Sequence, residues 1–382
     1  MPVSSTESLI EAKNLSNWKL VNNFRLRLKK IKGPSQETER AGGPKRLLLE
    51  EDYFSLILFG LLNPVVSTMR GICSISHIEK VQKSICSRPV SLGSFSEAQS
   101  VFDPELLKNV FLELSQESNI SWGDARLDKF KDRIKLVDGS LLPALPRMCW
   151  ALWLNEENRA AKLHLKFNVL TQTACDAIIT AGNTCERKTL RRFAQKDEII
   201  VGDRYYGLHY AYLGSLRDDG ISFVMRIRND AKAKIIQELP LSQADKKAGV
   251  TWQGMVKLGD KWAGEPIRVV RVEFDGKMIL LATDLDIEAD LISTIYKYRW
   301  QIELFFKWLK CILKCRHLIA ESKEGVEIQI YSALIAALML QQLIGRKPSK
   351  REMEFIELYL VGFIEIEELM GLLKLRKKDK KS

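Results

Sequence analysis

The spacing of hydrophobic residues changes near residue 128 of the chain. Between residues 46 and 127, leucine and aromatic side chains recur at helical spacing, with polar stops such as Asn63-Pro64 between the segments. Beyond residue 128, short apolar runs alternate with helical patterns. Strands are expected at 133–137, 162–170, 176–180, 198–201 and 221–227, and helices at 184–194 and 205–216. The order of three strands, helix, strand, helix and strand predicts a mixed α/β unit.

That alternation is interrupted over about 60 residues after Asn229. The interruption contains two apolar runs, Ile267–Phe274 and Met278–Ala282, separated by Asp275-Gly276, which is a strong signal for a two-residue hairpin turn. We therefore expect a β-rich insertion. A long helix is expected to start near Asp290, and the chain then continues with helices at 326–343 and 349–374.

These patterns divide the chain into four expected parts. Residues 1–45 are polar and interrupted by Gly33-Pro34 and Gly42-Gly43-Pro44, which predicts a polar basic arm. An all-helical N-terminal domain follows over 46–127. The α/β core is expected over 128–322, with the insertion at 229–288, and C-terminal helices with a basic tail over 323–382.

Composition narrows the class of protein. With 382 residues, of which 46% are hydrophobic, the chain can bury a sizeable core, so a wholly disordered or fibrous protein is excluded. The longest apolar runs are about ten residues, short of the roughly 20 that span a bilayer. The first residues lack a secretory pattern. We therefore expect a cytoplasmic protein, associated with the nucleoid if it acts on DNA, without a membrane partner. The seven cysteines form no Cys-x-x-Cys pair and are interpreted as reduced thiols.

The net charge of +11 favours a polyanionic partner such as DNA. Its distribution is uneven, because the segment Lys374–Ser382 carries six cations against Asp379 alone. About half of the net positive charge can therefore be explained by a solvated tail.

One face of the long helix near its middle carries a row of charged residues. At about 100° per residue, Tyr296, Arg299, Glu303 and Lys310 project within an arc of about 60°. Lys307 and Lys314 fall on or beside the same stripe. A plain explanation is a solvated face in which Glu303 pairs with Lys307 four residues on, worth about 0.2–0.5 kcal/mol.

Two further carboxylates argue against that plain explanation. Asp138 and Asp203 are each expected at or just past the end of a strand, the first and the fourth. An Asp after a strand is commonly only a turn residue. Together with Glu303, however, the two aspartates form a set of three carboxylates that can hold two Mg²⁺ ions, because hard cations bind anionic oxygens. Two such ions are suited to phosphoryl transfer, and the neighbouring cations to a phosphate backbone.

The helix segment also resembles a known family. It contains Tyr296, Arg299, Glu303 and Lys310 in the spacing Tyr-x2-Arg-x3-Glu-x6-Lys, which matches the IS-four-type DDE transposases of bacterial insertion sequences. Asp138-Gly-Ser and Gly-Asp203-Arg-Tyr-Tyr-Gly look like that family's first and second catalytic aspartates. The run Leu92–Gln99 is similar to one found in many members. The resemblance covers roughly residues 45–345.

This resemblance implies a fold, a chemistry and partners. The fold implied is α/β, a ribonuclease-H-like catalytic core with its β-rich insertion between Asp203 and Glu303. The implied catalytic residues are Asp138, Asp203 and Glu303, which would ligate two Mg²⁺ ions, with Mn²⁺ as a substitute. The implied partners are double-stranded DNA, as transposon ends and target DNA, and a second copy in a homodimer or larger assembly.

The same resemblance assigns DNA contacts to Tyr296, Arg299 and Lys310, and the basic stripe adds Lys307 and Lys314. The expected activity is cleavage of the element's terminal inverted repeats and transfer of the 3′ ends to target DNA, by a hairpin route in many relatives. Two rival interpretations remain: a DNA-binding descendant without catalysis, and a hydrolytic nuclease of the same core that never joins strands. A basic structural protein would require the carboxylates and the helix match to be coincidence.

Overall fold

The structure is a computed structural model that describes residues 19–32, 47–63, 65–66, 68–117, 122–259, 265–312, 318–360 and 363–379. The chain divides into two compact units. Unit 1 comprises residues 1–119, 142–161 and 307–382, and unit 2 comprises residues 120–141 and 162–306. The helices expected at the two ends of the chain therefore belong to the same unit. In the described ranges, no helix is both long enough and apolar enough to cross a membrane.

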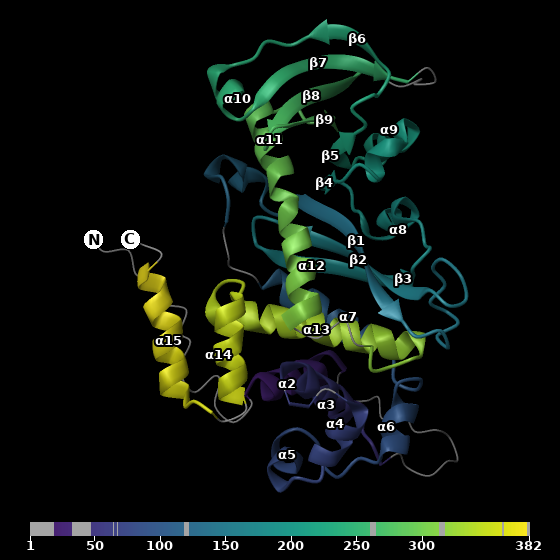
Figure 1. Ribbon diagram of the computed structural model, residues 1–382, viewed down its shortest axis with the longest axis vertical. Helices are drawn as coiled ribbons and strands as arrows, with labels where there is room; N and C mark the ends of the chain where they lie inside the picture. The colour runs from purple at the N-terminus through teal and green to yellow at the C-terminus, as the bar shows by residue number, and fades with distance from the viewer. Residues whose placement is uncertain are drawn as a thin grey trace. The chain divides into compact units, whose positions relative to one another are not determined.

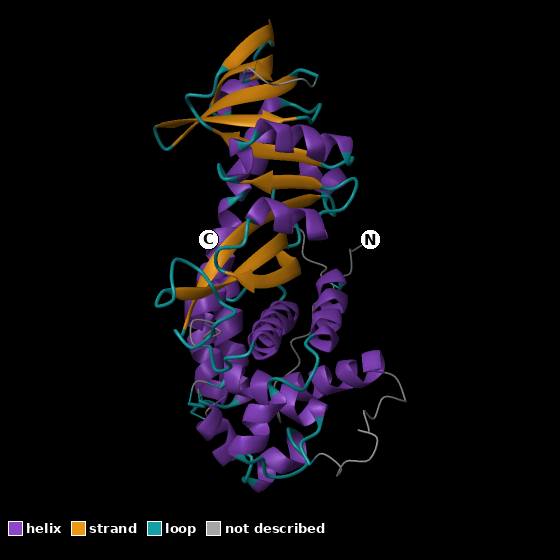
Figure 2. Ribbon diagram, turned by 90° about the vertical axis from the view of Figure 1, so that its right-hand side faces the viewer, coloured by secondary structure: helices purple, strands orange, loops and turns teal. Residues whose placement is uncertain are grey.

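Unit 1 is mainly helical (Figure 2). Its helices are α2 (Lys19–Lys32), α3 (Glu50–Leu62), α4 (Met69–Ile75), α5 (Glu79–Ser84), α6 (Leu92–Ala98), α7 (Glu105–Gln116), α13 (Lys323–Ile344), α14 (Lys350–Leu360) and α15 (Ile366–Asp379). Helix α13 packs against α3 and α7, which joins the N-terminal helices to the C-terminal ones. The expected all-helical N-terminal domain is thus helical, but α13 completes its core.

Helix α2 differs from the expected polar arm. Val21, Phe24 and Leu28 are spaced three and four apart and are almost fully buried, so they form one apolar face of a helix. That face packs on α3 and α7, and Arg25 pairs with the buried Asp52 of α3 at 3.0 Å. The sequence analysis missed this helix because charged residues surround a narrow apolar stripe. The rest of the arm lies outside the described residues.

Unit 2 is built on one sheet, to which the ends of β1 and β2 in unit 1 also belong. The strands are β1 (Ile134–Ala144), β2 (Arg159–Asn168), β3 (Thr173–Ala181), β4 (Ile199–Gly202), β5 (Ser222–Ile227), β6 (Ala233–Glu238), β7 (Val250–Leu258), β8 (Ile267–Phe274) and β9 (Lys277–Thr283). Their order in the sheet is β3-β2-β1-β4-β5-β9-β8-β7-β6. Strands β1, β4 and β5 are parallel neighbours, and β9 pairs antiparallel with β5.

The helices of unit 2 follow the order expected from sequence. They are α8 (Glu186–Phe193) between β3 and β4, α9 (Tyr210–Asp218) between β4 and β5, α10 (Gln243–Lys247) in the insertion, and α11 (Ala289–Tyr298) followed by α12 (Trp300–Ile312). Short 3₁₀ helices occupy Ala125–Phe130 and Tyr206–Leu208. The predicted series of three strands, helix, strand, helix and strand is confirmed.

The insertion after β5 is β-rich, as predicted, and it extends the same sheet. Asp275 and Gly276 both have positive φ, 48° and 73°, which is the conformation of a type I′ turn between β8 and β9. The twist of this turn matches that of the flanking strands, so the hairpin closes with residues Glu273 and Met278 in register. Backbone pairing of β9 with β5 then joins the insertion to the parallel strands.

The two faces of the parallel strands are covered by different helices. Val137, Ile200 and Phe223 pack in one cluster with Leu190 of α8 and Leu213 of α9. Successive residues of a strand point to opposite faces. The residues between these positions therefore face the other side. Helices α11 and α12 run across the strands of this unit (Figure 1). In the sheet, helix α11 contacts β5, β7 and β8.

The single long helix expected from sequence is interrupted at Arg299. The backbone there stays in the right-handed helical region, with φ −51° and ψ −32°. The turn is tightened, because the Arg299 N–H donates to the carbonyl of Tyr296 and the Ile302 N–H donates to the carbonyl of Arg299, both three residues back. The chain passes directly from α11 into α12.

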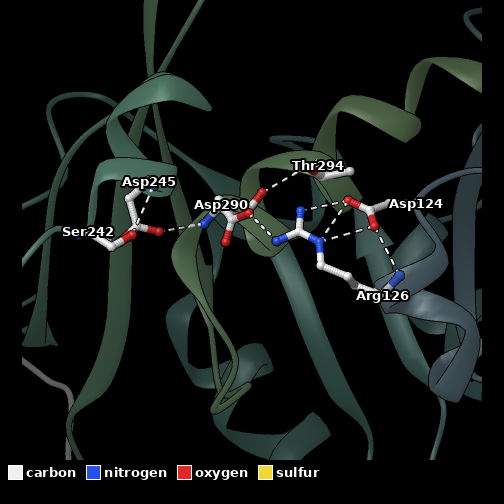
Figure 3. A network of polar contacts seen from close by, with 6 residues as sticks. All are labelled: Asp124, Arg126, Ser242, Asp245, Asp290 and Thr294. Atoms are coloured by element: carbon white, nitrogen blue, oxygen red, sulfur yellow. Dashed lines mark hydrogen bonds and ion pairs between the residues drawn. The ribbon is translucent and has the colours of Figure 1, made fainter.

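A polar network fixes the start of α11 (Figure 3). Arg126 donates to the buried carboxylate of Asp290 at 2.7 Å and also pairs with Asp124. On the other side, the backbone N–H of Asp290 donates to Asp245 of α10 at 2.8 Å, and Asp245 forms a capping box with Ser242. The network holds the N-terminal end of the helix that carries Tyr296.

Removing the central acceptor of this network should destabilise the protein. Asp245→Ala leaves the buried N–H group of Asp290 and the more exposed N–H group of Ser242 without their acceptor, so we expect a loss of about 2–4 kcal/mol in the free energy of unfolding. Ser242→Ala removes only the cap and should cost about 1 kcal/mol. Urea unfolding of both variants checks this, and equal losses would show that the bond to α11 contributes nothing.

Candidate active site

The register of two parallel strands leads toward Asp138 and Asp203. In β1 and β4, Ile134 lies opposite Ile199 and Leu136 lies opposite Val201, a constant offset of 65 residues. Asp138 and Asp203 follow the last of these pairs by two residues and have the same offset, although Asp203 lies just past the end of β4. The charge of Asp203 raises the pKa of Asp138, which is consistent with two neighbouring carboxylates. The interval of 65 residues between the aspartates thus has a structural meaning, because it equals the strand register.

Asp138 and helix α12 lie on the same face of the sheet. Val137 belongs to the cluster under α8 and α9, so Asp138 faces the opposite side. On this opposite side, the Phe305 ring of α12 lies 5.2 Å from the Phe167 ring of β2. Helix α12, which carries Glu303, therefore packs on the face from which Asp138 projects. Asp203 directly follows the end of β4.

The position of Asp138 in its strand differs from the expectation. The sequence analysis placed it at or just past a strand end, whereas β1 continues to Ala144. The apolar run ends at Val137, which is why the strand was expected to end there. Backbone pairing with β4 is recorded only as far as Leu136 and Val201, and β4 ends at Gly202. Asp138 therefore lies within β1 but beside the end of its neighbour, where the carboxylate has room.

The electrostatics of Asp138 reflect this environment. Burial raises the pKa of its carboxyl group most strongly, and the negative charges of Asp203 and Glu186 raise it further. The N–H of Gly139, which donates to Asp138 at 2.8 Å, and the charge of Arg299 lower it in part. The resulting pKa is about 7, far above that of an exposed aspartate. These carboxylates thus form an anionic site that favours a bound cation.

Glu303 reaches this site as one partner of an ion pair within the helix segment. Arg299 donates to Glu303 at 2.5 Å across one helical turn, and the guanidinium lies 5.9 Å from the ring centre of Tyr296. The positive charge of Arg299 also lowers the pKa of Asp138, and the negative charge of Asp203 raises the pKa of Tyr296. Arg299 and Tyr296 of the predicted stripe therefore lie near the two aspartates. Glu303 pairs with Arg299, whereas the plain explanation had paired it with Lys307.

The remaining lysines of the stripe lie farther along the chain. Lys307 is exposed on α12 and Lys310 is partly exposed on the same helix. Lys314 lies outside the described residues. The arrangement thus brings Asp138, Asp203, Arg299, Tyr296 and Glu303 into one electrostatic neighbourhood. That the lysines contact DNA remains a prediction.

The donor set suits a hard divalent cation. Carboxylate oxygens are the preferred protein ligands of Mg²⁺ and Mn²⁺, and the pKa of Asp138 is raised by burial and by the negative charges of Asp203 and Glu186. Within the described parts of the chain, no three acidic, histidine or cysteine side chains are already arranged as a set of metal ligands. Glu303 is held by Arg299, and like charges repel in the absence of a cation, so a bound ion would have to draw the three together.

One acidic residue at this site was missed by the sequence analysis. Glu186 is the first residue of α8, and its Oε1 lies so close to Gly139 that a Cβ there would be only 2.8 Å away. Its charge contributes to the raised pKa of Asp138. No spacing in the sequence marks Glu186, because an acid in the first turn of a helix is common and favourable in itself.

Comparison with known proteins shows the family of this chain. The family described as the transposase DDE domain matches residues 129–339. A putative transposase for insertion sequence element IS4SA of Synechocystis sp. (strain ATCC 27184 / PCC 6803 / Kazusa) is 39% identical over 290 residues, covering 72% of this chain and 78% of that protein. The chain therefore belongs to the DDE transposase family, as the sequence resemblance predicted.

Two other similarities have lower identity. The putative transposase y4zB of Sinorhizobium fredii (strain NBRC 101917 / NGR234) is 27% identical over 215 residues, which is 54% of this chain, and the chain spans 60% of that relative's length. Among solved structures, the piggyBac transposase synaptic complex with hairpin DNA has a TM-score of 0.44 and 10% identity, covering 96% of this chain and 84% of that one.

Proposed function

We propose that this protein is a metal-dependent DNA transposase. It binds the terminal inverted repeats of its own insertion sequence, cleaves them, and transfers the freed 3′ ends to target DNA. It acts on double-stranded DNA as a homodimer or larger assembly on paired ends. The observation that carries this proposal is that Asp138 lies among the charges of Asp203 and Arg299, with Glu303 paired to Arg299, in a chain of the DDE transposase family.

The proposed core is ribonuclease-H-like. It is supported by the sheet order β3-β2-β1-β4-β5 with β1, β4 and β5 parallel, and by an insertion that lies between Asp203 and Glu303. Such an order brings the first and fourth strands together in the sheet although 65 residues separate their aspartates. Asp138 lies within β1 and Asp203 directly follows β4, so pairing of the two strands brings the segments of both proposed catalytic aspartates together.

Each residue of the site has a proposed task. Asp138, Asp203 and Glu303 would hold two divalent cations, Mg²⁺ or Mn²⁺. When bound, these ions would supply the charge that activates the attacking oxygen and stabilises the leaving oxygen of an in-line phosphoryl transfer. Arg299 holds Glu303 in place and presents a guanidinium to a phosphate group, and Tyr296 supports that guanidinium with its ring.

The lysines of α12 are proposed to contact the DNA backbone. Lys310→Ala should weaken binding to end DNA about uniformly across sequences and lower the slope of log affinity against log salt by about one, because one phosphate contact is lost. Lys350→Ala, which removes an exposed lysine of α14, is the matched control and should leave the slope unchanged. Fluorescence anisotropy at several salt concentrations measures both, and an unchanged slope for Lys310→Ala would remove Lys310 from the interface.

The proposal is tested with a plasmid that carries the DNA flanking the gene for this protein. Purified protein is incubated with it in Mg²⁺ or Mn²⁺, and wild type is compared with Asp138→Ala. We expect excised and joined products with wild type only, and only when the metal is present. Nicking without joined products would indicate a hydrolytic nuclease instead. Binding without cleavage in wild type would indicate a DNA-binding descendant that has lost catalysis.

A further inference from the structure

The outer side of helix α8 carries only positive charge. Four cations share this side and form what we call the cationic face of α8: Arg187, Lys188, Arg191 and Arg192. At about 100° per residue, they fall within an arc of about 140°. The buried residues of the helix lie on the opposite side, in an arc of about 100°, and are Thr189, Leu190 and Phe193. The helix therefore packs on the sheet through one side and presents cations on the other.

Acidic side chains neutralise little of this face. Glu186, the single acid of α8, lies on the buried side, where its Oε1 is 3.4 Å from Nζ of Lys162. Arg191 pairs with Asp219 at 2.8 Å. Lys188 and Arg192 are exposed and have no ion pair within the described ranges of the chain. A surface with uncompensated cations favours a polyanionic partner.

Arg187 connects the cationic face to the segment of Asp203. Its guanidinium donates to the carbonyl of Tyr205 at 2.8 Å and lies 4.6 Å from the centre of the Tyr205 ring. The backbone N–H of Tyr205 in turn donates to Oδ1 of Asp203 at 2.9 Å. The cationic face thus begins two contacts away from a proposed catalytic aspartate.

The cationic face and helix α12 belong to opposite sides of the sheet. Leu190 of α8 packs in one cluster with Val137 of β1, whereas Phe305 of α12 contacts Phe167 of β2 on the other side. The lysines of α12 are the proposed contacts for end DNA. Strand transfer requires a second duplex at the same carboxylates, and α8 offers that duplex a surface of its own.

The size of the cationic face suits a short stretch of DNA backbone. From Arg187 to Arg192 the helix rises about 7.5 Å, a length over which one DNA strand carries about two phosphate charges. Contacts from lysine and arginine to phosphates position a duplex but carry no sequence information. The face is therefore suited to a duplex that is bound by its backbone.

We propose that the cationic face of α8 binds the backbone of the target duplex, beside the segment that carries Asp203. This inference rests on the proposed transposase function. Two alternatives are separated from it by experiment. The face could contact the element's own end, or it could be a solvated surface with no DNA contact.

The first test measures binding to a duplex that lacks the element's ends. Lys188→Gln combined with Arg192→Gln removes two exposed charges and leaves Arg187 in place. The slope of log affinity against log salt, measured by fluorescence anisotropy in Ca²⁺, should fall by about two, because each lost phosphate contact contributes about 0.9. The matched control combines Lys246→Gln with Lys247→Gln, two exposed lysines in the last turn of α10, and should keep the wild-type slope.

The second test measures joining separately from cleavage. A pre-cleaved element end is incubated with a target plasmid and Mg²⁺, and cleavage of an uncut end is followed in parallel. The Lys188→Gln and Arg192→Gln double variant should form about tenfold less joined product near physiological salt, while it cleaves ends at the wild-type rate. A higher plasmid concentration should restore joining, because weaker target binding leaves the chemical step unchanged. The α10 control should match wild type in both reactions.

The outcomes also separate this inference from the proposed function. An unchanged salt slope and unchanged joining would show that the face is only solvated. Equal losses of end cleavage and joining would assign the face to the element's own end, and an equal fall of the slope in the α10 control would show that only total charge matters. Wild type that cleaves ends but joins none would overturn strand transfer and the target assignment together, whereas the salt slope would still decide whether α8 contacts DNA.

Discussion

Glu303→Gln is expected to slow cleavage of end DNA by at least about 10³-fold, which corresponds to a rise of about 4 kcal/mol in the activation barrier. Glutamine keeps the length of the side chain and can still accept a hydrogen bond from Arg299, so the helix pair is changed little. It removes the negative charge that a divalent cation would need. Affinity for end DNA, measured by gel shift in Ca²⁺, should stay within about threefold of wild type.

The control for this variant is Glu327→Gln. Glu327 is a mostly buried glutamate that pairs with Lys323 across one helical turn, as Glu303 pairs with Arg299, yet it has no proposed part in catalysis. Its cleavage rate should equal that of wild type. An equal loss of cleavage and DNA binding in Glu303→Gln would instead show that the Arg299–Glu303 pair is structural and that another group completes the metal centre.

The second large effect concerns the pH dependence of stability in the absence of divalent metal. The pKa of Asp138 is about 7 in the folded protein, against about 3.9 for an unfolded aspartate. Between these values, the folded state binds more protons than the unfolded state, so the free energy of unfolding falls as pH rises from about 4 to about 7. The full loss above pH 7 is up to about 4 kcal/mol.

Asp138→Asn removes this titration. Its free energy of unfolding should therefore exceed that of wild type at pH 8 and match it more closely at pH 4, as measured by urea unfolding at both pH values. Asp132→Asn, at an exposed aspartate before β1, should follow the wild-type curve. Added Mg²⁺ should raise the melting temperature of wild type but not of Asp138→Asn. Parallel pH curves for wild type and Asp138→Asn would contradict the burial of this carboxylate.

Several features of the fold could be predicted because they depend on local patterns. The hairpin at Asp275-Gly276 follows from a turn that requires two residues with positive φ, and the structure has both. Alternating and continuous apolar runs identified the strands of the parallel core, and the helical period placed Tyr296, Arg299 and Glu303 on one face. The triad itself was proposed from the spacing of three carboxylates and a family resemblance.

Other features could not be predicted because they depend on which strands become neighbours. The continuation of β1 beyond Asp138 is stabilised by strand pairing that local sequence does not reveal, since the apolar run stops at Val137. Helix α2 is stable because a narrow apolar stripe finds a partner in α3 and α7. The pairing of Glu303 with Arg299 was one of several that the helix spacing permitted.

The sequence by itself determined the order of elements, the hairpin, the charged helix face and the three carboxylates, because these are set by periodicity and residue type within short segments. Only the tertiary structure decided that β1 and β4, which lead to Asp138 and Asp203, are parallel neighbours, that burial raises the pKa of Asp138, and that Glu186 approaches through the space at Gly139. These features depend on strand neighbours, on desolvation and on a missing Cβ. Each arises when segments distant in the chain pack together.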